Sequence, residues 1–169
     1  MSQAMMLPKG TAMMHVKKEI SSEWPRGRHR VAALLLQNRL MRIRHNVFFA
    51  SDAHMQLISA SLMKPDSAAV IFCNSGITVD SLKIAQMAKE AGATVVYVTK
   101  FPQTPAAAHA DIILSCGATK DPIQGGSLTT ISSQTFLVGL LYSEMMRRMD
   151  GQATANKIKT SQAIAHRRL

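Results

Sequence analysis

The chain has 169 residues, of which 47% are hydrophobic, 5% aromatic and 18% charged, and its formal net charge is +10. That length allows one domain with a substantial hydrophobic core. No apolar run reaches the ~18 residues that a membrane span needs, and no signal peptide is visible, so we expect a cytoplasmic protein. The two cysteines, Cys73 and Cys116, have neither metal-site spacing nor a disulfide framework, and we expect no metal and no cofactor.

Positive charge is concentrated toward the two ends of the chain. Residues 1–50 hold nine Lys or Arg and two Glu, residues 51–140 hold five Lys and six acids, and residues 141–169 hold six Lys or Arg and two acids. These segments carry +7, −1 and +4, which sum to +10. A basic surface can bind nucleic acid, but we find no helix-turn-helix pattern, zinc-ligand spacing or interleaving of aromatic and basic residues. The alternative is a solvated basic arm and a basic helix end.

The first 30 residues show no sustained periodicity, and we expect an irregular basic arm there. Beyond it, short apolar strands alternate with amphipathic helices. The predicted helices cover residues 31–44, 52–63, 79–91, 127–149 and 154–165, with a short helix inside 100–110. The predicted strands cover residues 47–50, 68–74, 94–99 and 111–115. This alternation predicts a three-layer, Rossmann-like (flavodoxin-like) α/β domain over residues 31–169, with a central parallel sheet covered on both faces.

The most informative segment is residues 70–78, where a buried apolar strand changes abruptly to small polar residues before a helix begins. A helix N-terminus has unpaired N–H groups and a positive dipole end, which attract anions. A glycine there would let a ligand approach the backbone, and hydroxyl side chains would add donors. The segment therefore predicts a phosphate-ester site; an ordinary strand-to-helix turn with capping hydroxyls is the alternative. The predicted site comprises Cys73, Asn74, Ser75, Gly76 and Thr78, with Ser127 nearby.

This turn resembles the phosphate-binding turn of the sugar isomerase (SIS) domain family, which reads roughly Ser-x-Ser-Gly-x-Thr. Ser75, Gly76 and Thr78 match, and Cys73 stands where the first serine usually lies. Further segments that look like the family, in the family's order, are residues 85–99, 104–105, 110–114, 126–130 and 134–142. Within the family, residues 47–62 and the tail 161–169 are similar to the effector domain of RpiR-type transcription regulators. The resemblance covers residues 31–169 and implies a SIS domain that binds a phosphorylated sugar.

Two parts of that family pattern are missing from the sequence. The family begins with a central strand and a Gly-x-Gly-x-Ser loop, whereas residues 21–30 contain neither an apolar run nor paired glycines. Pro25 lacks the amide that a central strand needs, and three arginines would charge a strand that should be apolar. The regulators' helix-turn-helix domain, their means of binding DNA, is also absent. We therefore expect a truncated effector domain with an open sheet edge, which favours a dimer or larger assembly through residues 31–44 and 127–149.

Further candidate residues lie where strands or helices meet the predicted ligand edge. Asp52 and His54 follow a strand and could contact a sugar hydroxyl or transfer a proton; alternatively, Asp52 caps a helix and His54 is a surface histidine. Thr130 lies in the first turn of the helix that begins at Ser127, where hydroxyls either cap the helix or close over the ligand. Lys100 follows a strand and could pair with a phosphate, although a solvated lysine is the simpler interpretation.

Two classes of function fit the resemblance: a non-catalytic sugar-phosphate sensor, the effector part of a regulator, and an aldose–ketose sugar-phosphate isomerase. Isomerisation needs a general base over the carbon acid. The chain has four glutamates, and the two in predicted helices, Glu90 and Glu144, lie away from the strand ends. Asp52, His54 and Asp121 are the residues placed to act as bases. This scarcity favours the sensor; a third alternative is a poorly folding fragment without function.

Overall fold

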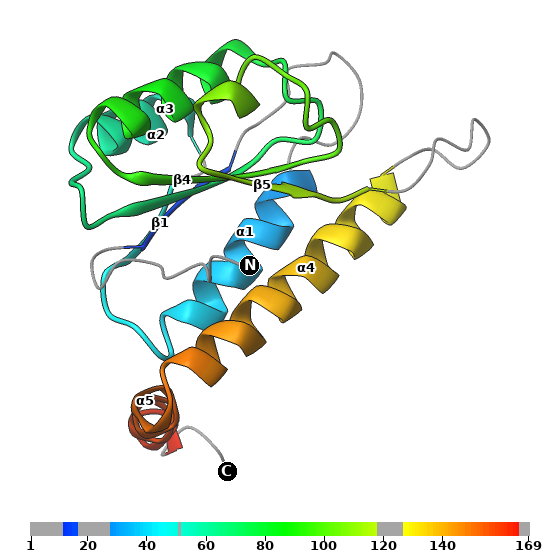
Figure 1. The fold of residues 1–169 in the computed structure, drawn as a ribbon. Helices are drawn as coiled ribbons and strands as arrows, with labels where there is room; N and C mark the ends of the chain where they lie inside the picture. Colours follow the sequence, from blue (N-terminus) through cyan, green and yellow to red (C-terminus); the bar gives the residue numbers. More distant parts are fainter. Residues whose placement is uncertain (1–11, 17–27, 51, 118–126, 166–169) are drawn as a thin grey trace, which may run out of the picture.

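The fold is organised around a sheet of five parallel strands in the order β2-β1-β3-β4-β5. The structure is a computed structural model that describes residues 12–16, 28–50, 52–117 and 127–165 (Figure 1). The strands are β1 (Ala12–Val16), β2 (Val47–Ala50), β3 (Ala68–Phe72), β4 (Thr94–Thr99) and β5 (Ile112–Ser115). Because every strand pair is parallel, all five carboxyl ends lie at one edge, which we call the carboxyl edge.

β1 was not predicted. It lies in the middle of the sheet, with Met14 aligned to Phe49 of β2 on one side and to Val70 of β3 on the other. The expectations of a missing first strand and of a wholly irregular arm are therefore wrong for residues 12–16. β1 has only five residues and is followed directly by lysines, so it lacks the long apolar signal of a doubly covered strand. A glycine loop would fall in residues 17–27, which lie outside the described residues.

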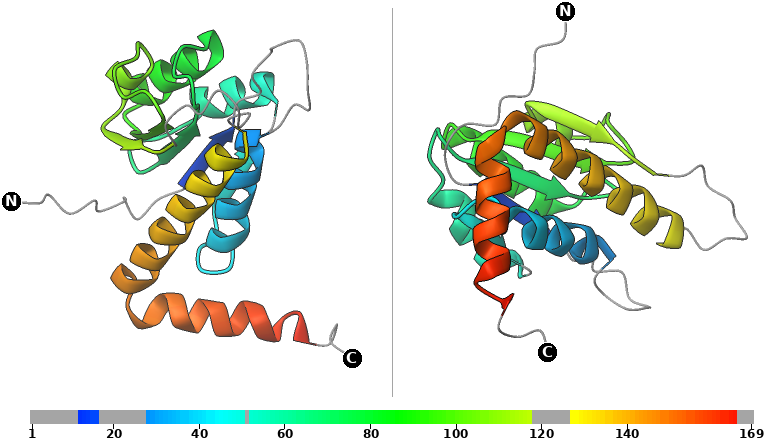
Figure 2. Two further views of the ribbon diagram at one scale, coloured as in Figure 1. Left: turned by 90° about the vertical axis from the view of Figure 1, so that its right-hand side faces the viewer. Right: turned by 90° about the horizontal axis from the view of Figure 1, so that it is seen from below.

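Helices cover both faces of the sheet, which confirms the predicted α/β architecture (Figures 1 and 2). One face carries α2 and α3 packed together, and the other carries α1 and α4 packed together. A short 3-10 helix, η1, contacts α3, and α5 follows α4 at an angle (Figure 2). The helices are α1 (Arg28–Leu40), α2 (Ala53–Ser61), α3 (Val79–Glu90), η1 (Ala107–His109), α4 (Ser127–Arg148) and α5 (Gly151–Gln162).

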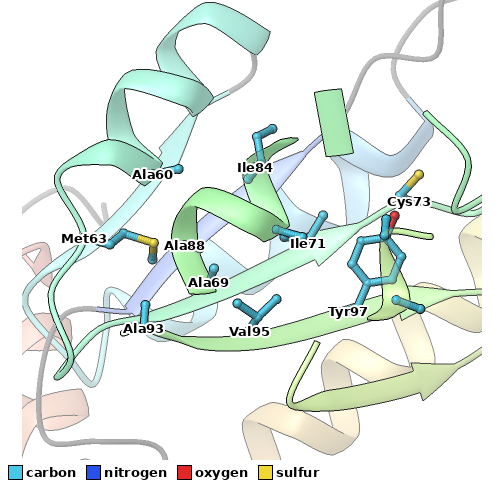
Figure 3. Packing of buried hydrophobic residues seen from close by; sticks show 13 residues of the cluster. Ala60, Met63, Ala69, Ile71, Cys73, Ile84, Ala88, Ala93, Val95 and Tyr97 are labelled. Carbon is cyan, nitrogen blue, oxygen red and sulfur yellow. The ribbon is translucent and has the colours of Figure 1, made fainter. Parts of the chain in front are cut away.

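Strand alternation divides the core into two clusters, one on each face of the sheet. Ile71 and Tyr97 belong to the cluster under α2 and α3 (Figure 3), whereas Phe72 and Val98 belong to the cluster against α1 and α4. All residues of β3 are buried, as are all but the first of β4. This burial on both faces explains why these two strands are continuous apolar runs in the sequence.

Element boundaries follow local backbone chemistry. The predicted bounds of β2 and β4 are confirmed. α3 ends in a Schellman motif: Gly92 has φ +78° and donates its N–H to the Lys89 carbonyl at 2.9 Å, while Ala93 N–H donates to Ala88 at 3.0 Å. α5 begins at Gly151, three residues earlier than predicted, directly after a turn at Asp150 with φ +48°.

Asp111 links α3, β4 and β5 on the outer part of the sheet. Its carboxylate pairs with Lys89 of α3 and accepts the Val95 N–H of β4 at 2.9 Å. Partial burial raises the pKa of Asp111, but these two interactions outweigh it and hold the pKa below the ordinary value of 3.8.

In the described part of the chain, no helix is both long and apolar enough to span a membrane.

Candidate ligand-binding site

The predicted phosphate turn follows β3 at the carboxyl edge and leads into α3. Its first half is tied to the end of β4: Cys73 N–H donates to the Val98 carbonyl at 2.9 Å, and the Asn74 carbonyl accepts the Lys100 N–H at 3.2 Å. The Thr99 hydroxyl donates to the same Asn74 carbonyl at 3.2 Å. The neighbouring strand therefore fixes the position of the turn before any ligand binds.

Gly76 is required by the backbone of the turn. Its φ is +69°, a left-handed conformation that costs an L-residue roughly 1–2 kcal/mol. A Cβ atom at this position would also lie 2.6 Å from both Cγ2 and Oγ1 of Thr104. The sequence predicted that this glycine admits a ligand to the backbone, which stays a prediction; in the structure, it admits the Thr104 side chain from the loop after β4.

Backbone donors are available where α3 begins. Thr78 is the N-cap residue, with φ −86° and ψ 134°, and its side chain makes no cap hydrogen bond. The first N–H groups of α3 therefore lack an acceptor from the cap and carry the positive end of the helix dipole. Ile77 and Val79 are 72% and 79% exposed, so the turn is open to solvent. This geometry can hold an anion, although Asp80 in the first turn competes for the same positive end.

The Thr78 hydroxyl points into a buried polar network instead. Its Oγ1 lies 2.8 Å from Ser81 Oγ and 3.2 Å from Cys73 Sγ. Ser81 Oγ also donates to the Thr78 carbonyl at 2.8 Å and accepts from Tyr97 OH at 3.1 Å. Figure 3 shows the Tyr97 hydroxyl approaching Cys73 beneath the turn. The threonine thus joins the start of α3 to the core. Ser75 is partly exposed, and its Oγ lies 3.9 Å from Cys73 Sγ, farther than the Thr78 hydroxyl.

This network changes the acidity of its members. Burial raises the pKa of the Cys73 thiol, but hydrogen bonds from Ser81, and then from Thr78, Tyr97 and the Gly76 backbone, outweigh burial and leave the pKa below its ordinary value. Burial raises the pKa of Tyr97, and the neighbouring thiol raises it further. Cys73 is therefore part of a buried polar network directly beneath the turn.

Asp52 and His54 follow β2, as the N-cap and an early residue of α2, and β1 separates β2 from β3 in the sheet. The Asp52 carboxylate accepts the N–H groups of His54 at 3.0 Å and Met55 at 3.2 Å, so it caps α2. His54 is exposed. The structure thus shows the capping alternative for Asp52 and the surface alternative for His54. Asp121 lies outside the described residues, among which no group of three His, Cys, Asp or Glu could hold a metal ion.

The beginning of α4 lies at the same edge, on the opposite face of the sheet from α3 (Figure 1). Ser127 is the first helical residue, and its side chain lies outside the described ones. Thr130 is buried at 7% exposure, and its carbonyl accepts the Ser133 hydroxyl at 3.0 Å. The place of Ser127 and Thr130 in the ligand site stays a prediction. Lys100 contacts the ring of Phe101, with 5.7 Å from Nζ to the centroid.

Three buried side-chain atoms after the strands lack a partner in the described structure; Asn74 was a predicted site residue, whereas Gln56 and Thr104 were not predicted. Gln56 is 1% exposed and donates its Nε2 to the Ala50 carbonyl at 2.8 Å, but its Oε1 has no partner among the described residues. Asn74 Oδ1 and Thr104 Oγ1 are likewise buried and unpaired in the described structure. Such groups are rare in folded proteins and need an explanation. Asn74 and Thr104 lie in the segments that follow β3 and β4, at the edge where parallel sheets bind ligands, whereas Gln56 lies inside α2.

Comparison with known proteins identifies the family. The model of the SIS domain matches residues 26–144. The chain belongs to the SIS domain family. The matched region includes the phosphate turn, α3 and most of α4, and it begins after β1. The resemblance inferred from Ser75, Gly76 and Thr78 is therefore confirmed at the level of the domain.

Several curated relatives of this SIS domain are transcription regulators. An uncharacterised HTH-type transcriptional regulator of Clostridium perfringens (strain 13 / Type A) is 31% identical over 134 residues, which are 79% of this chain and 48% of the relative. HTH-type transcriptional regulator RpiR of Escherichia coli (strain K12) is 26% identical over 129 residues, which are 76% of this chain and 44% of the relative. The chain spans about half the length of these relatives.

Solved structures with the same fold include the NanR protein and an RpiR transcription factor. The Vibrio vulnificus NanR protein complexed with ManNAc-6P superimposes with a TM-score of 0.78 at 18% identity, covering 93% of this chain and 56% of that one. The sugar isomerase domain of the RpiR transcription factor from Sphaerobacter thermophilus gives a TM-score of 0.71 at 18% identity, covering 92% and 80%. These matches establish the SIS fold for this chain.

Proposed function

We propose that this chain is a cytoplasmic, non-catalytic SIS domain that binds a phosphorylated sugar as the ligand-sensing part of an RpiR-type transcription regulator. The observation that carries the proposal is the turn between β3 and α3, where Gly76 adopts a left-handed conformation and the first N–H groups of α3 have no side-chain cap. Two further facts support it. The SIS-domain relatives above are HTH-type regulators, and one structure of this fold, NanR, is a complex with a sugar phosphate.

In this proposal, different parts of the ligand contact different groups. The phosphate would lie at the N-terminus of α3, where backbone N–H groups and the Ser75 hydroxyl can donate to it. Thr78 would contribute mainly its backbone, because its hydroxyl already bonds within the buried network. The unpaired oxygens of Asn74 and Gln56 are acceptors that sugar hydroxyls could satisfy.

The same geometry favours sensing over isomerisation. A general base must lie within hydrogen-bond reach of the carbon acid. The Asp52 carboxylate caps α2. His54 is exposed, and it follows β2, which β1 separates from the strand that leads to the phosphate turn. Asp80 lies in the first turn of α3, next to where the phosphate would bind. It would therefore lie near the phosphate and not near the carbon that loses its proton in isomerisation.

Calorimetric titration with a panel of hexose and pentose phosphates, each paired with its unphosphorylated sugar, tests the proposal. We expect at least one phosphate to bind and its free sugar to bind far more weakly. Ser75→Ala should weaken binding by roughly 1.5–3 kcal/mol, the usual contribution of a hydrogen bond to a charged group. Ser143→Ala is the matched control, because Ser143 is exposed on the distal part of α4 and should leave affinity unchanged.

The catalytic alternative is tested on the same panel by NMR. The proposal predicts that aldose and ketose phosphates are not interconverted and that no deuterium from solvent enters the carbon next to the carbonyl. Protein-dependent exchange at that carbon, lost in Ser75→Ala, would establish an isomerase instead. Absence of binding by every sugar phosphate, with the fold intact by circular dichroism, would refute both functions.

We propose that a second copy of the chain packs against the outer faces of α1 and α4. α1 exposes Val31 and Leu34 by 49% and 44%, and α4 exposes Phe136 and Leu140 by 69% and 52%. The two helices pack against each other, so these side chains belong to one helical layer of the molecule. Large apolar side chains gathered on one layer are typical of an interface. A dimer would be consistent with the assembly predicted from the sequence.

A further inference from the structure

A polar cavity lies at the end of the sheet opposite the phosphate turn. It encloses about 490 Å³, within the size range of small-molecule sites. Asn46 directly precedes β2, so this cavity lies at the amino ends of the parallel strands, away from the carboxyl edge. We call it the amino-edge pocket, and its lining residues are Ile43, Arg44, His45, Asn46, Arg148, Met149, Gln152 and Asn156.

Contacts between distant parts of the chain build this pocket. The Asn156 side chain donates to the Ile43 carbonyl at 2.9 Å, and the Thr160 hydroxyl donates to the Arg42 carbonyl at 3.1 Å. Arg42 in turn donates to the Ser161 hydroxyl at 3.2 Å. α5 thus supplies donors to the carbonyls that follow the end of α1, and the pocket walls are held by these bonds rather than by a single loop.

The amino-edge pocket is rich in positive charge and hydrogen-bond donors. No carboxylate is among its lining residues, whereas two arginines, a histidine and three side-chain amides are. Arg44 Nε is buried and has no hydrogen-bond partner in the described structure, although a guanidinium N–H normally has one. Arg148 pairs with Glu144 at 2.5 Å, but that same glutamate also pairs with Arg147, so the three side chains keep a net positive charge.

The start of α5 adds to this potential. Gln152 lies in the first turn of α5, which contains no acidic residue. The N-cap residue Asp150 has φ +48° and makes no side-chain cap hydrogen bond. Because Asp150 carries a negative charge at this end of α5, it offsets part of the helix dipole, and the helix adds only the remainder to the potential where Gln152 lines the pocket.

We propose that the amino-edge pocket binds a small polyanion, a metabolite that carries a phosphate cluster or several carboxylates, independently of the sugar phosphate at the carboxyl edge. Arg44 is its central ligand, because its buried Nε lacks a partner that such an anion would provide. Because the anion would contact the segment after α1, the end of α4 and the start of α5 together, its binding would fasten α5 to the domain.

NMR titration of the full chain with pyrophosphate, and separately with citrate, tests this proposal. We expect the amide signals of residues 43–46 and 148–152 to shift with saturation, and the signals of residues 75–81 to respond less. Arg44→Gln should weaken the binding about tenfold, equal to about 1.4 kcal/mol. The response to the two probes shows whether phosphate or carboxylate groups are preferred, and each result would support the pocket.

Two further variants keep the test independent of folding. Gln152→Glu places an acid in the first turn of α5, where it favours the helix, yet it should reduce anion binding at least tenfold by repulsion. Lys157→Gln removes an exposed charge from α5 outside the pocket lining and should change affinity less than twofold. Any of three results would overturn the proposal. They are an equal loss of affinity in Lys157→Gln and Arg44→Gln, amide shifts spread over all basic residues, and the absence of a saturable shift.

Discussion

Replacing Gly76 by alanine is the sharpest test of how the phosphate turn is built. The substitution meets two separate costs. A left-handed φ of +69° costs an alanine roughly 1–2 kcal/mol. The new Cβ would also lie 2.6 Å from two atoms of the Thr104 side chain and 2.9 Å from its Cβ, and overpacking of this kind costs typically 1–3 kcal/mol. Gly76→Ala should therefore lower the free energy of unfolding by about 2–5 kcal/mol.

A double-mutant cycle separates the two costs. Thr104→Gly removes all three crowding atoms, so in that background Gly76→Ala should cost only the ~1–2 kcal/mol of the left-handed conformation. The assay is urea denaturation of the four proteins, with m-values compared to exclude a change in two-state behaviour. Gly92→Ala is the control, because Gly92 has φ +78° but its Cβ would meet Pro65 rather than Thr104. A coupling energy under about 0.5 kcal/mol between Gly76→Ala and Thr104→Gly would refute the packing argument.

Four further predictions follow from charge and exposure. Asp80→Asn should tighten sugar-phosphate binding about threefold in calorimetry, because it removes the acid from the first turn of α3; unchanged or weaker affinity would contradict this. Asp111→Asn should lower stability by about 1 kcal/mol at neutral pH, and the difference should shrink as pH falls below about 4, since a lowered carboxyl pKa stabilises the fold only while the group is ionised; denaturation at several pH values decides it. Phe136→Asp should reduce the mass measured by light scattering whereas Leu62→Asp, an equally exposed site on the other face, should not. In gel shifts, DNA binding by this chain should be weak, indifferent to sequence and lost at physiological salt; salt-resistant preference for one duplex would disprove it.

The strands that are buried on both faces could be predicted from the sequence because their signal is strong. β3 and β4 are continuous apolar runs bounded by turn residues, and the predicted bounds of β4 are those of the structure. The step from Phe72 to small polar residues likewise revealed the turn before α3. These features depend on residues that are neighbours in sequence, which is the range over which a pattern can be recognised.

β1 could not be predicted, since its role depends on long-range pairing. Residues 12–16 form a central strand because both β2 and β3 offer it hydrogen-bonding partners, not because their own composition requires it. The argument from Pro25 concerned residues 21–30, which follow the strand, so it could not exclude a strand at residues 12–16. Length and periodicity carry little information for a five-residue element.

The candidate site likewise combines features that neighbouring residues predict with features that depend on long-range pairing. Ser75, Gly76 and Thr78 were recognised from their spacing, whereas the hydroxyl of Thr78 was assigned to a ligand and is found in a network with Ser81. Tyr97 belongs to this network through cross-strand register, which aligns it with Ile71 two residues before Cys73. Period-2 alternation on two adjacent strands was the available signal, but it becomes usable only once the pairing of β3 with β4 is known.

The central claim, that a phosphorylated sugar binds where β3 meets α3, is tested most directly by amide NMR mapping with the tightest ligand of the calorimetric panel. The account predicts saturable shifts at residues 75–81, strongest at Gly76 and in the first turn of α3, and their loss in Ser75→Ala without a change in fold. It also predicts that the matched unphosphorylated sugar leaves these signals in place. Saturable shifts that fall elsewhere and leave residues 75–81 unmoved would contradict the claim.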